Sequence, residues 1–322
     1  AGNSGSSGGP HVHFEIRKTA TQETQNVVAM GMIPAFDDIA PLFMRVHYIE
    51  IDTIQGVAVN SRPRTLGVKR ETPTTYTAAS TEPLGVGAKG YFVLEASDRR
   101  NNVSNTFGLY RVTARIDGEI FYEYLMDGFT FDLSRYCNAV SYYPIKRRSR
   151  NEVFRMAQLD GNIFPYSKMV NRGVITTRKG ETRTIEIEVE DERKNISTLT
   201  FQIEGRGDEA SFRAKIDSAA VVANNRSTFN HSQDGLSIRI PAGALYEPIF
   251  YTQHIDEELN AKMVERNDST LIVLSDVYVV GDPNTPLQKS ARLTIKGYVP
   301  ENLRRYTTIA GVGENGGLWQ AG

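Results

Sequence analysis

Alternation of apolar and polar residues constrains this chain more than any other feature of its sequence. Residues 184–191 (TIEIEVED) place an apolar side chain at every second position, and residues 196–203 (ISTLTFQI) largely repeat the pattern after four polar residues. Successive side chains of a β-strand point to opposite faces, so a period of two fits a strand with one buried face and does not fit a helix. The two runs therefore predict an antiparallel hairpin.

A second hairpin is predicted by residues 109–116 (LYRVTARI) and 119–124 (EIFYEY), because Asp117 and Gly118 stand between them. An Asp-Gly pair between alternating runs is a strong hairpin signal, since both positions of the tightest turn need a positive φ. The fold class that we predict is all-β. Further strand-like runs cover residues 42–51, 90–96, 236–240, 270–274, 277–280 and 291–296.

Composition excludes several classes of protein. The chain has 322 residues, enough for two or more domains, and its 37 basic and 38 acidic residues nearly cancel. That balance argues against a nucleic-acid partner, and no apolar run approaches the roughly 20 residues of a transmembrane helix. Cys137 is the only cysteine, so no disulfide can form within the chain.

We expect four segments. Residues 1–33 form a separate N-terminal piece, residues 34–206 one enlarged β-sandwich, residues 207–299 a second β-sandwich module, and residues 300–322 the start of a further element that is cut short. Within the first sandwich, residues 129–166 are expected to form a long excursion without clear strands, which is typical of a functional or poorly ordered loop.

Three sequence segments resemble parts of known β-sandwich modules. Residues 42–51, preceded by DDIAP, resemble the first strand of a bacterial Ig-like module. The hairpin of residues 184–203 is similar to the one that closes many Ig-like and fibronectin-like modules, with Arg193 and Lys194 in place of the usual glycine. Residues 234–245 (DGLSIRIPAGAL) resemble a signature of small β-sandwich modules in surface proteins.

The candidate catalytic and metal-binding residues lie in the N-terminal piece. His11 and His13 are two positions apart and Glu15 follows, so on a β-strand these three side chains share one face while the apolar residues between them form the other. Residues 2–10 (GNSGSSGGP) are too rich in Gly and Ser for the interior of an element, and we expect Ser7 and Gly9 to line the site from a loop.

Residues 4–15 (SGSSGGPHVHFE) resemble the closing motif of the lysostaphin-like (LytM-type) zinc endopeptidases, which cut peptide cross-links in bacterial peptidoglycan. The resemblance implies that His13 binds Zn²⁺ and that His11 acts as a catalytic base or stabilises the transition state. Gly8 stands where that family more often has Thr or Ser, which leaves the metal chemistry untouched. Glu15 is expected to orient a ligating histidine or to line the site, not to bind the metal.

Two metal ligands are missing from the sequence. A catalytic zinc ion usually has three protein ligands and one water, and this family takes its other two ligands from an upstream His-x-x-x-Asp. No histidine of the chain reproduces that spacing: His47 precedes Asp52, His231 precedes Asp234, and His254 precedes Asp256. We therefore interpret residues 1–33 as the C-terminal end of a catalytic domain and expect the chain to be truncated at both ends.

The densest positive charge lies in residues 146–150 (KRRSR). Lys146, Arg147, Arg148 and Arg150 could contact an anionic cell-wall polymer, although a solvated basic loop explains the same residues.

These features predict part of a bacterial zinc metalloendopeptidase of the cell envelope, in the periplasm or at the surface. Its partners would be peptidoglycan peptides and the missing catalytic portion or another envelope protein. The chain alone is expected to be inactive. Two alternatives remain open: a non-catalytic scaffold or regulator of envelope hydrolases, and an adhesive, cell-wall-binding β-sandwich protein.

Overall fold

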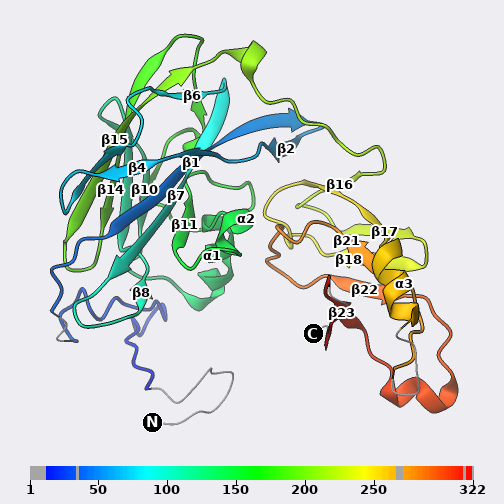
Figure 1. The fold of residues 1–322 in the computed structure, drawn as a ribbon. Coiled ribbons are helices and arrows are strands. Elements are labelled where there is room, and N and C mark those ends of the chain that lie inside the picture. Colours follow the sequence, from blue (N-terminus) through cyan, green and yellow to red (C-terminus); the bar gives the residue numbers. More distant parts are fainter. Residues whose placement is uncertain (1–11, 34–35, 266–270, 315–316, 321–322) are drawn as a thin grey trace. The chain divides into compact units, whose positions relative to one another are not determined.

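A computed structural model describes residues 12–33, 36–265, 271–314 and 317–320 (Figure 1). β-Strands are the dominant secondary structure, which confirms the all-β class. The chain divides into two compact units. The first contains the described residues up to 214 except 55–58, and the second contains residues 55–58 and the described residues from 215 onward.

The first unit contains two sheets. One has the order β11-β7-β1-β2, with β3 also paired to β1, and β8 and β13 to β7; the other has the order β12-β10-β9-β14-β15-β5-β4, with β6 paired to β15. The strands of the first sheet are β1 (Leu42–Ile54), β2 (Val57–Asn60), β3 (Arg64–Leu66), β7 (Lys89–Arg99), β8 (Thr106–Phe107), β11 (Glu152–Arg155) and β13 (Ile175–Thr176). Those of the second are β4 (Val68–Arg70), β5 (Thr75–Ala78), β6 (Leu84–Val86), β9 (Arg111–Ile116), β10 (Glu119–Leu125), β12 (Lys168–Met169), β14 (Thr182–Glu190) and β15 (Ile196–Gly205).

The two sheets pack face to face around one core. Phe92 of β7 meets Phe201 of β15 edge to face, with ring centroids 5.6 Å apart, and Phe43 of β1 meets Tyr76 of β5 at 5.1 Å. Side chains from both sheets belong to a single buried cluster. The first unit is therefore a β-sandwich, whose inner faces hold the alternating apolar residues of each strand.

Both predicted hairpins are confirmed. β9 and β10 pair antiparallel across Asp117 and Gly118, whose φ angles of 50° and 84° are those of the tight turn that the sequence indicated. β14 and β15 pair with Glu190 opposite Ile196, and the apolar residues of β14 all point into the core.

The segment 129–166 differs from the prediction. It contains η1 (Phe131–Tyr136), α1 (Cys137–Val140) and α2 (Tyr143–Lys146), but it also contributes β11, which extends the first sheet beside β7. The expectation that this segment contains no strand is wrong for residues 152–155. These four residues do not alternate between apolar and polar, so their sequence gives no sign of the strand that they form beside β7. Two short helical turns, η2 (Asn171–Gly173) and η3 (Asp208–Ala210), complete this unit.

The second unit consists of short paired strands around a small core. The strands predicted at 236–240, 277–280 and 291–296 are present, whereas residues 271–274 belong to no strand. The pairs are β16 (Val221–Ala223) with β19 (Ile249–Tyr251), β18 (Leu236–Ile240) with β17 (Phe229–Gln233) and β22 (Arg292–Ile295), β20 (Gln253–Ile255) with β21 (Tyr278–Val280), and β23 (Ala310–Val312) with β24 (Leu318–Gln320). Its helices are α3 (Glu257–Glu265) and η4 (Glu301–Tyr306). Within the described ranges of both units, the helices lack the length and apolar character that crossing a bilayer demands.

Substitution of Gly90 tests how closely the strands of the first sheet are packed. A Cβ at this buried position would overlap the Ile49 carbonyl oxygen and the Tyr48 ring, so Gly90→Ala is expected to lower the free energy of unfolding by roughly 1–3 kcal/mol. Gly108→Ala is the matched control, because its Cβ would meet only the Glu152 Cγ, at 4.0 Å. Urea denaturation followed by circular dichroism measures both, and equal stability of the two variants would contradict this account of the sheet.

Candidate functional site

The structure describes two of the five residues assigned to the zinc motif. His13 and Glu15 lie in described chain, whereas Ser7, Gly9 and His11 lie outside it. Residues 12–16 form no strand. Val12 and Phe14, which the alternation assigned to a packing face, are 78% and 57% exposed. An apolar face is buried only where a partner strand or sheet covers it, and none of the described chain does so here.

His13 is the first of a short series of contacts that ends on the sandwich. Its Nε2 lies 3.4 Å from Glu15 Oε2, and 70% of its side chain is exposed. Glu15 accepts hydrogen bonds from Arg17, which lower the pKa of the Glu15 carboxyl and keep it charged. The Arg17 guanidinium lies 4.3 Å from the centre of the Phe131 ring. Glu15 can therefore orient the His13 imidazole while Arg17 holds Glu15.

Backbone hydrogen bonds anchor this segment on the loop after β10. The N–H and hydroxyl of Thr24 both donate to the Phe129 carbonyl, at 3.0 and 2.8 Å, and the Asn26 N–H donates to the Asp127 carbonyl at 3.2 Å. Gly128 permits this approach, since a Cβ there would overlap the Thr24 carbonyl oxygen. The sequence that follows the histidines is thus attached to the sandwich and does not hang free of it.

The described residues do not form a zinc site by themselves. Among them, the one group of three or more acidic, Cys or His side chains close enough to share an ion consists of Asp37, Asp98 and Asp191, and it does not include His13. A catalytic zinc ion needs three protein ligands, and His13 supplies one imidazole. Two further ligands would have to come from residues outside the described ranges.

The basic loop is exposed at its tip and anchored at its base. Lys146 Nζ donates to the Asn151 carbonyl at 2.9 Å and pairs with Glu152 at 3.0 Å, while Arg147, Arg148 and Arg150 are exposed. These three arginines give the loop a positive surface.

The anchor of this loop is Glu95 of β7. Glu95 accepts hydrogen bonds of 2.8 Å from both Ser149 and Asn151. Burial alone would raise the pKa of the Glu95 carboxyl, but hydrogen bonds from Asn151, Ser149 and Arg45 outweigh it and hold that pKa below its usual value. The carboxylate is therefore charged and holds the loop by charge-assisted bonds.

Two surface cavities of the described chain do not bring together a nucleophile with a base that would activate it. A hollow of about 400 Å³ lies on the sheet of β17, β18 and β22, and one of about 180 Å³ lies beside β11 and β10. The second contains Cys137, but burial raises the pKa of its thiol, so the thiolate that would act as a nucleophile is disfavoured.

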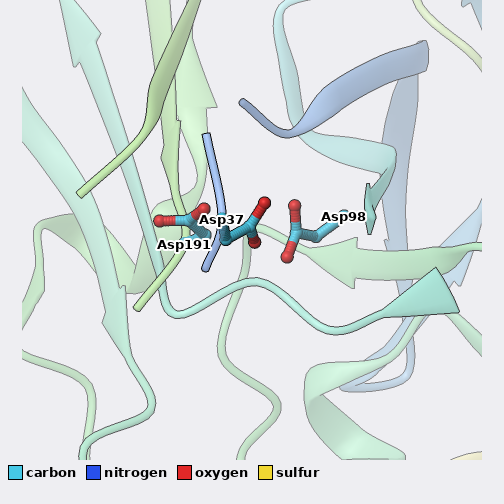
Figure 2. A group of neighbouring side chains, drawn as sticks. All are labelled: Asp37, Asp98 and Asp191. Atoms are coloured by element: carbon cyan, nitrogen blue, oxygen red, sulfur yellow. The ribbon is translucent and has the colours of Figure 1, made fainter. Parts of the chain in front are cut away.

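Three aspartates from distant parts of the sequence meet at one end of the sandwich (Figure 2). Asp37 precedes β1, Asp98 lies near the end of β7, and Asp191 directly follows β14. One carboxylate oxygen from each lies within 4.8 Å of the oxygens of the other two. The group therefore lies where the segment before β1 passes close to an end of a strand from each sheet.

The three carboxylates differ in their hydrogen bonds. Asp191 accepts from the Arg193 and Asn195 N–H groups, at 2.7 and 2.9 Å, and from the Asn195 side-chain amide at 2.7 Å. Asp37 accepts from the Ile39 N–H at 3.1 Å through one oxygen, and its other oxygen has no hydrogen-bond partner. Neither oxygen of Asp98 has a partner in the described chain, although the residue is completely buried.

Electrostatics single out Asp98. Burial raises the pKa of its carboxyl to about 7, and the negative charges of Asp191, Asp37 and Glu192 add to the increase. The adjacent Arg99 N–H offsets part of it through its dipole, although it does not meet hydrogen-bond geometry with either oxygen. The nearby cation Arg100 is already paired with Glu192. No basic side chain in the described structure forms an ion pair with Asp98 to compensate its charge.

Sequence reasoning missed this group. In the sequence, Asp37 belongs to the segment before the first predicted strand, Asp191 ends a predicted hairpin strand, and Asp98 carries no recognisable motif. Their one sequence signal is position, since each stands at an end of a strand or of the segment that leads into one. Adjacency in space depends on the pairing of sheets that a single sequence does not specify.

No family model, curated protein or solved structure matches this chain.

Asp98 gives the first unit a predicted pH dependence. Its pKa is raised in the folded state, so the stability that it contributes is present below about pH 4 and is lost as the pH rises through about 7. In EDTA, Asp98→Asn should therefore gain stability relative to the wild type between pH 5 and pH 8, on the order of 2 kcal/mol.

The control is Asp38→Asn, which removes the neighbouring exposed charge. Its unfolding free energy should follow the wild type at every pH. Parallel pH profiles for Asp98→Asn and the wild type would show that Asp98 is not a strained carboxyl.

Proposed function

We propose that this chain is the C-terminal part of a zinc metalloendopeptidase of the bacterial cell envelope that hydrolyses peptide cross-links in peptidoglycan. The observation that carries the proposal is the phrase of residues 4–15, which contains both histidines in the family's order and spacing. The exposed His13 imidazole beside Glu15 supports it, because a ligand must be accessible and is commonly oriented by a carboxylate.

The residues have separable roles in this proposal. His13 binds the metal together with two ligands outside the described residues, and His11 holds or moves a proton at the attacking water. Bound zinc supplies a water that is acidic enough to be a nucleophile at neutral pH. Glu15 keeps the His13 imidazole in place, and Arg17 keeps Glu15 charged.

The sandwich has a supporting role. It anchors the segment after the histidines through the contacts of Thr24 and Asn26 with residues 127–129, so it can position the catalytic part. Arg147, Arg148 and Arg150 give it a cationic surface suited to anionic polymers of the cell wall. Both features favour an envelope location with peptidoglycan as the partner.

The first test uses this chain alone. Because it offers too few of the ligands that a catalytic site needs, isothermal titration should give a dissociation constant for Zn²⁺ weaker than about 1 µM. His13→Ala should weaken binding further, while His254→Ala, which removes an exposed histidine of β20, should not. Tight 1:1 binding that disappears in His13→Ala would show that the chain completes the site itself.

The second test uses a protein that includes the complete catalytic domain. His13→Ala should lose both zinc and hydrolysis of peptidoglycan, whereas His11→Ala should keep zinc and lose roughly 10²–10⁴-fold in kcat, the usual contribution of a general base. Metal analysis and release of soluble peptidoglycan fragments measure the two effects. If His11→Ala lost zinc and His13→Ala kept it, the two roles would be reversed. If neither variant changed zinc content or hydrolysis, the peptidase would be refuted in favour of a scaffold.

A further inference from the structure

We propose that Asp37, Asp98 and Asp191 bind a calcium ion where the chain passes from the histidine-bearing segment into the sandwich. This site shares no residue with the zinc motif and does not depend on zinc binding there.

The buried carboxylate of Asp98 is the main observation. Asp98 is 0% exposed, and neither of its carboxylate oxygens has a hydrogen-bond partner. Figure 2 shows that its carboxylate is directed towards that of Asp37, whose second oxygen is also without a partner. Buried polar groups are almost always paired, and buried charges are paired or coordinate a metal. These oxygens therefore lack a positively charged partner.

The donor set selects the kind of ion. All three ligands are carboxylate oxygens, which suit hard cations, whereas zinc sites in proteins are rich in imidazole and thiolate. Calcium binds oxygen at roughly 2.3–2.6 Å, so two of its ligands can be about 5 Å apart. The three oxygens lie within 4.8 Å of one another, which is within that span.

Calcium fits better than magnesium for two reasons. It accepts irregular coordination by six to eight oxygens, including water, while magnesium demands a near-ideal octahedron at shorter distances. The three aspartates come from three separate segments, whose carboxylates no single local loop pre-arranges. Water molecules would supply the remaining ligands.

A shared proton is the competing explanation. A proton between Asp98 and Asp37 would neutralise one charge and satisfy two of the three oxygens that lack a partner, one on each residue, leaving the third without one. An ion would satisfy Asp98 and Asp37 together and would also offset the charge of Asp191. The two explanations differ in whether added calcium stabilises the folded chain.

The position of the site suggests what the ion does. Arg193 donates to the Ile33 carbonyl at 3.0 Å and Asn195 donates to the Asp37 carbonyl at 3.1 Å, so the loop that holds Asp191 already contacts the chain on its way to β1. A calcium ion would add a bond from that chain to β7. It would thereby fix the attachment of the histidine-bearing segment to both sheets.

The experiment uses this chain after treatment with EGTA, at pH 7.5. Titration with CaCl₂ should show one ion per chain with a micromolar to millimolar dissociation constant, the range of sensors and extracellular modules. In scanning calorimetry, 5 mM CaCl₂ should raise the Tm of the first unit by about 3 °C or more, and 5 mM MgCl₂ should raise it less. Asp98→Asn should bind at least 10-fold more weakly and lose the shift, while Asp38→Asn should stay within 2-fold of the wild type.

Three results would overturn the proposal. The first is no binding and no shift with calcium, which would leave the shared proton as the explanation. The second is an equal shift with magnesium, which would refute the choice of ion. The third is unchanged calcium binding in Asp98→Asn or, if that variant does not fold by circular dichroism, in Asp37→Asn, whose half-buried carboxylate should be equally necessary.

Discussion

The contact between the inner faces of the two sheets is the interaction on which the rest of the first unit depends. Phe92 and Phe201 meet across the interface, and the apolar side chains of β7, β9, β14 and β15 join them in one cluster. This packing brings the ends of β7 and β14 together, although the two strands belong to different sheets. The polar features at the edge of the sandwich exist because the core fixes these strand ends.

Asp98 shows what that packing costs. Every residue of β7 from 90 to 98 is buried, so the strand carries its final carboxylate into the same interior as its apolar residues. An amide or an apolar side chain at this position would make the folded state more stable than an uncompensated carboxylate does. Burial and the neighbouring negative charges instead destabilise the charged form of Asp98, which is why its pKa is raised, and the calcium ion proposed above would compensate that charge.

Sequence reasoning succeeded where the physical signal is local. The alternation in residues 184–203 and the Asp117-Gly118 turn each act within a few residues, and both hairpins formed as predicted. It failed for β11, whose four residues show no alternation and are held in the sheet by β7. The aspartate group was missed because it depends on contacts between segments far apart in the chain. The histidine motif was recognisable by its residue types, but His13 belongs to no possible metal-binding group within the described chain.

The turn between β14 and β15 has a further consequence. Lys194 adopts a φ of 72°, where glycine would be unstrained, and its side chain pairs with Glu190 at 2.6 Å and lies 4.7 Å from the Tyr110 ring centre. An electrostatic attraction therefore helps to hold a backbone shape that the residue itself disfavours. Because dissolved ions weaken such an attraction and the Lys194 side chain is largely exposed, the help that this pair gives to the turn before Asn195 decreases as the ionic strength rises.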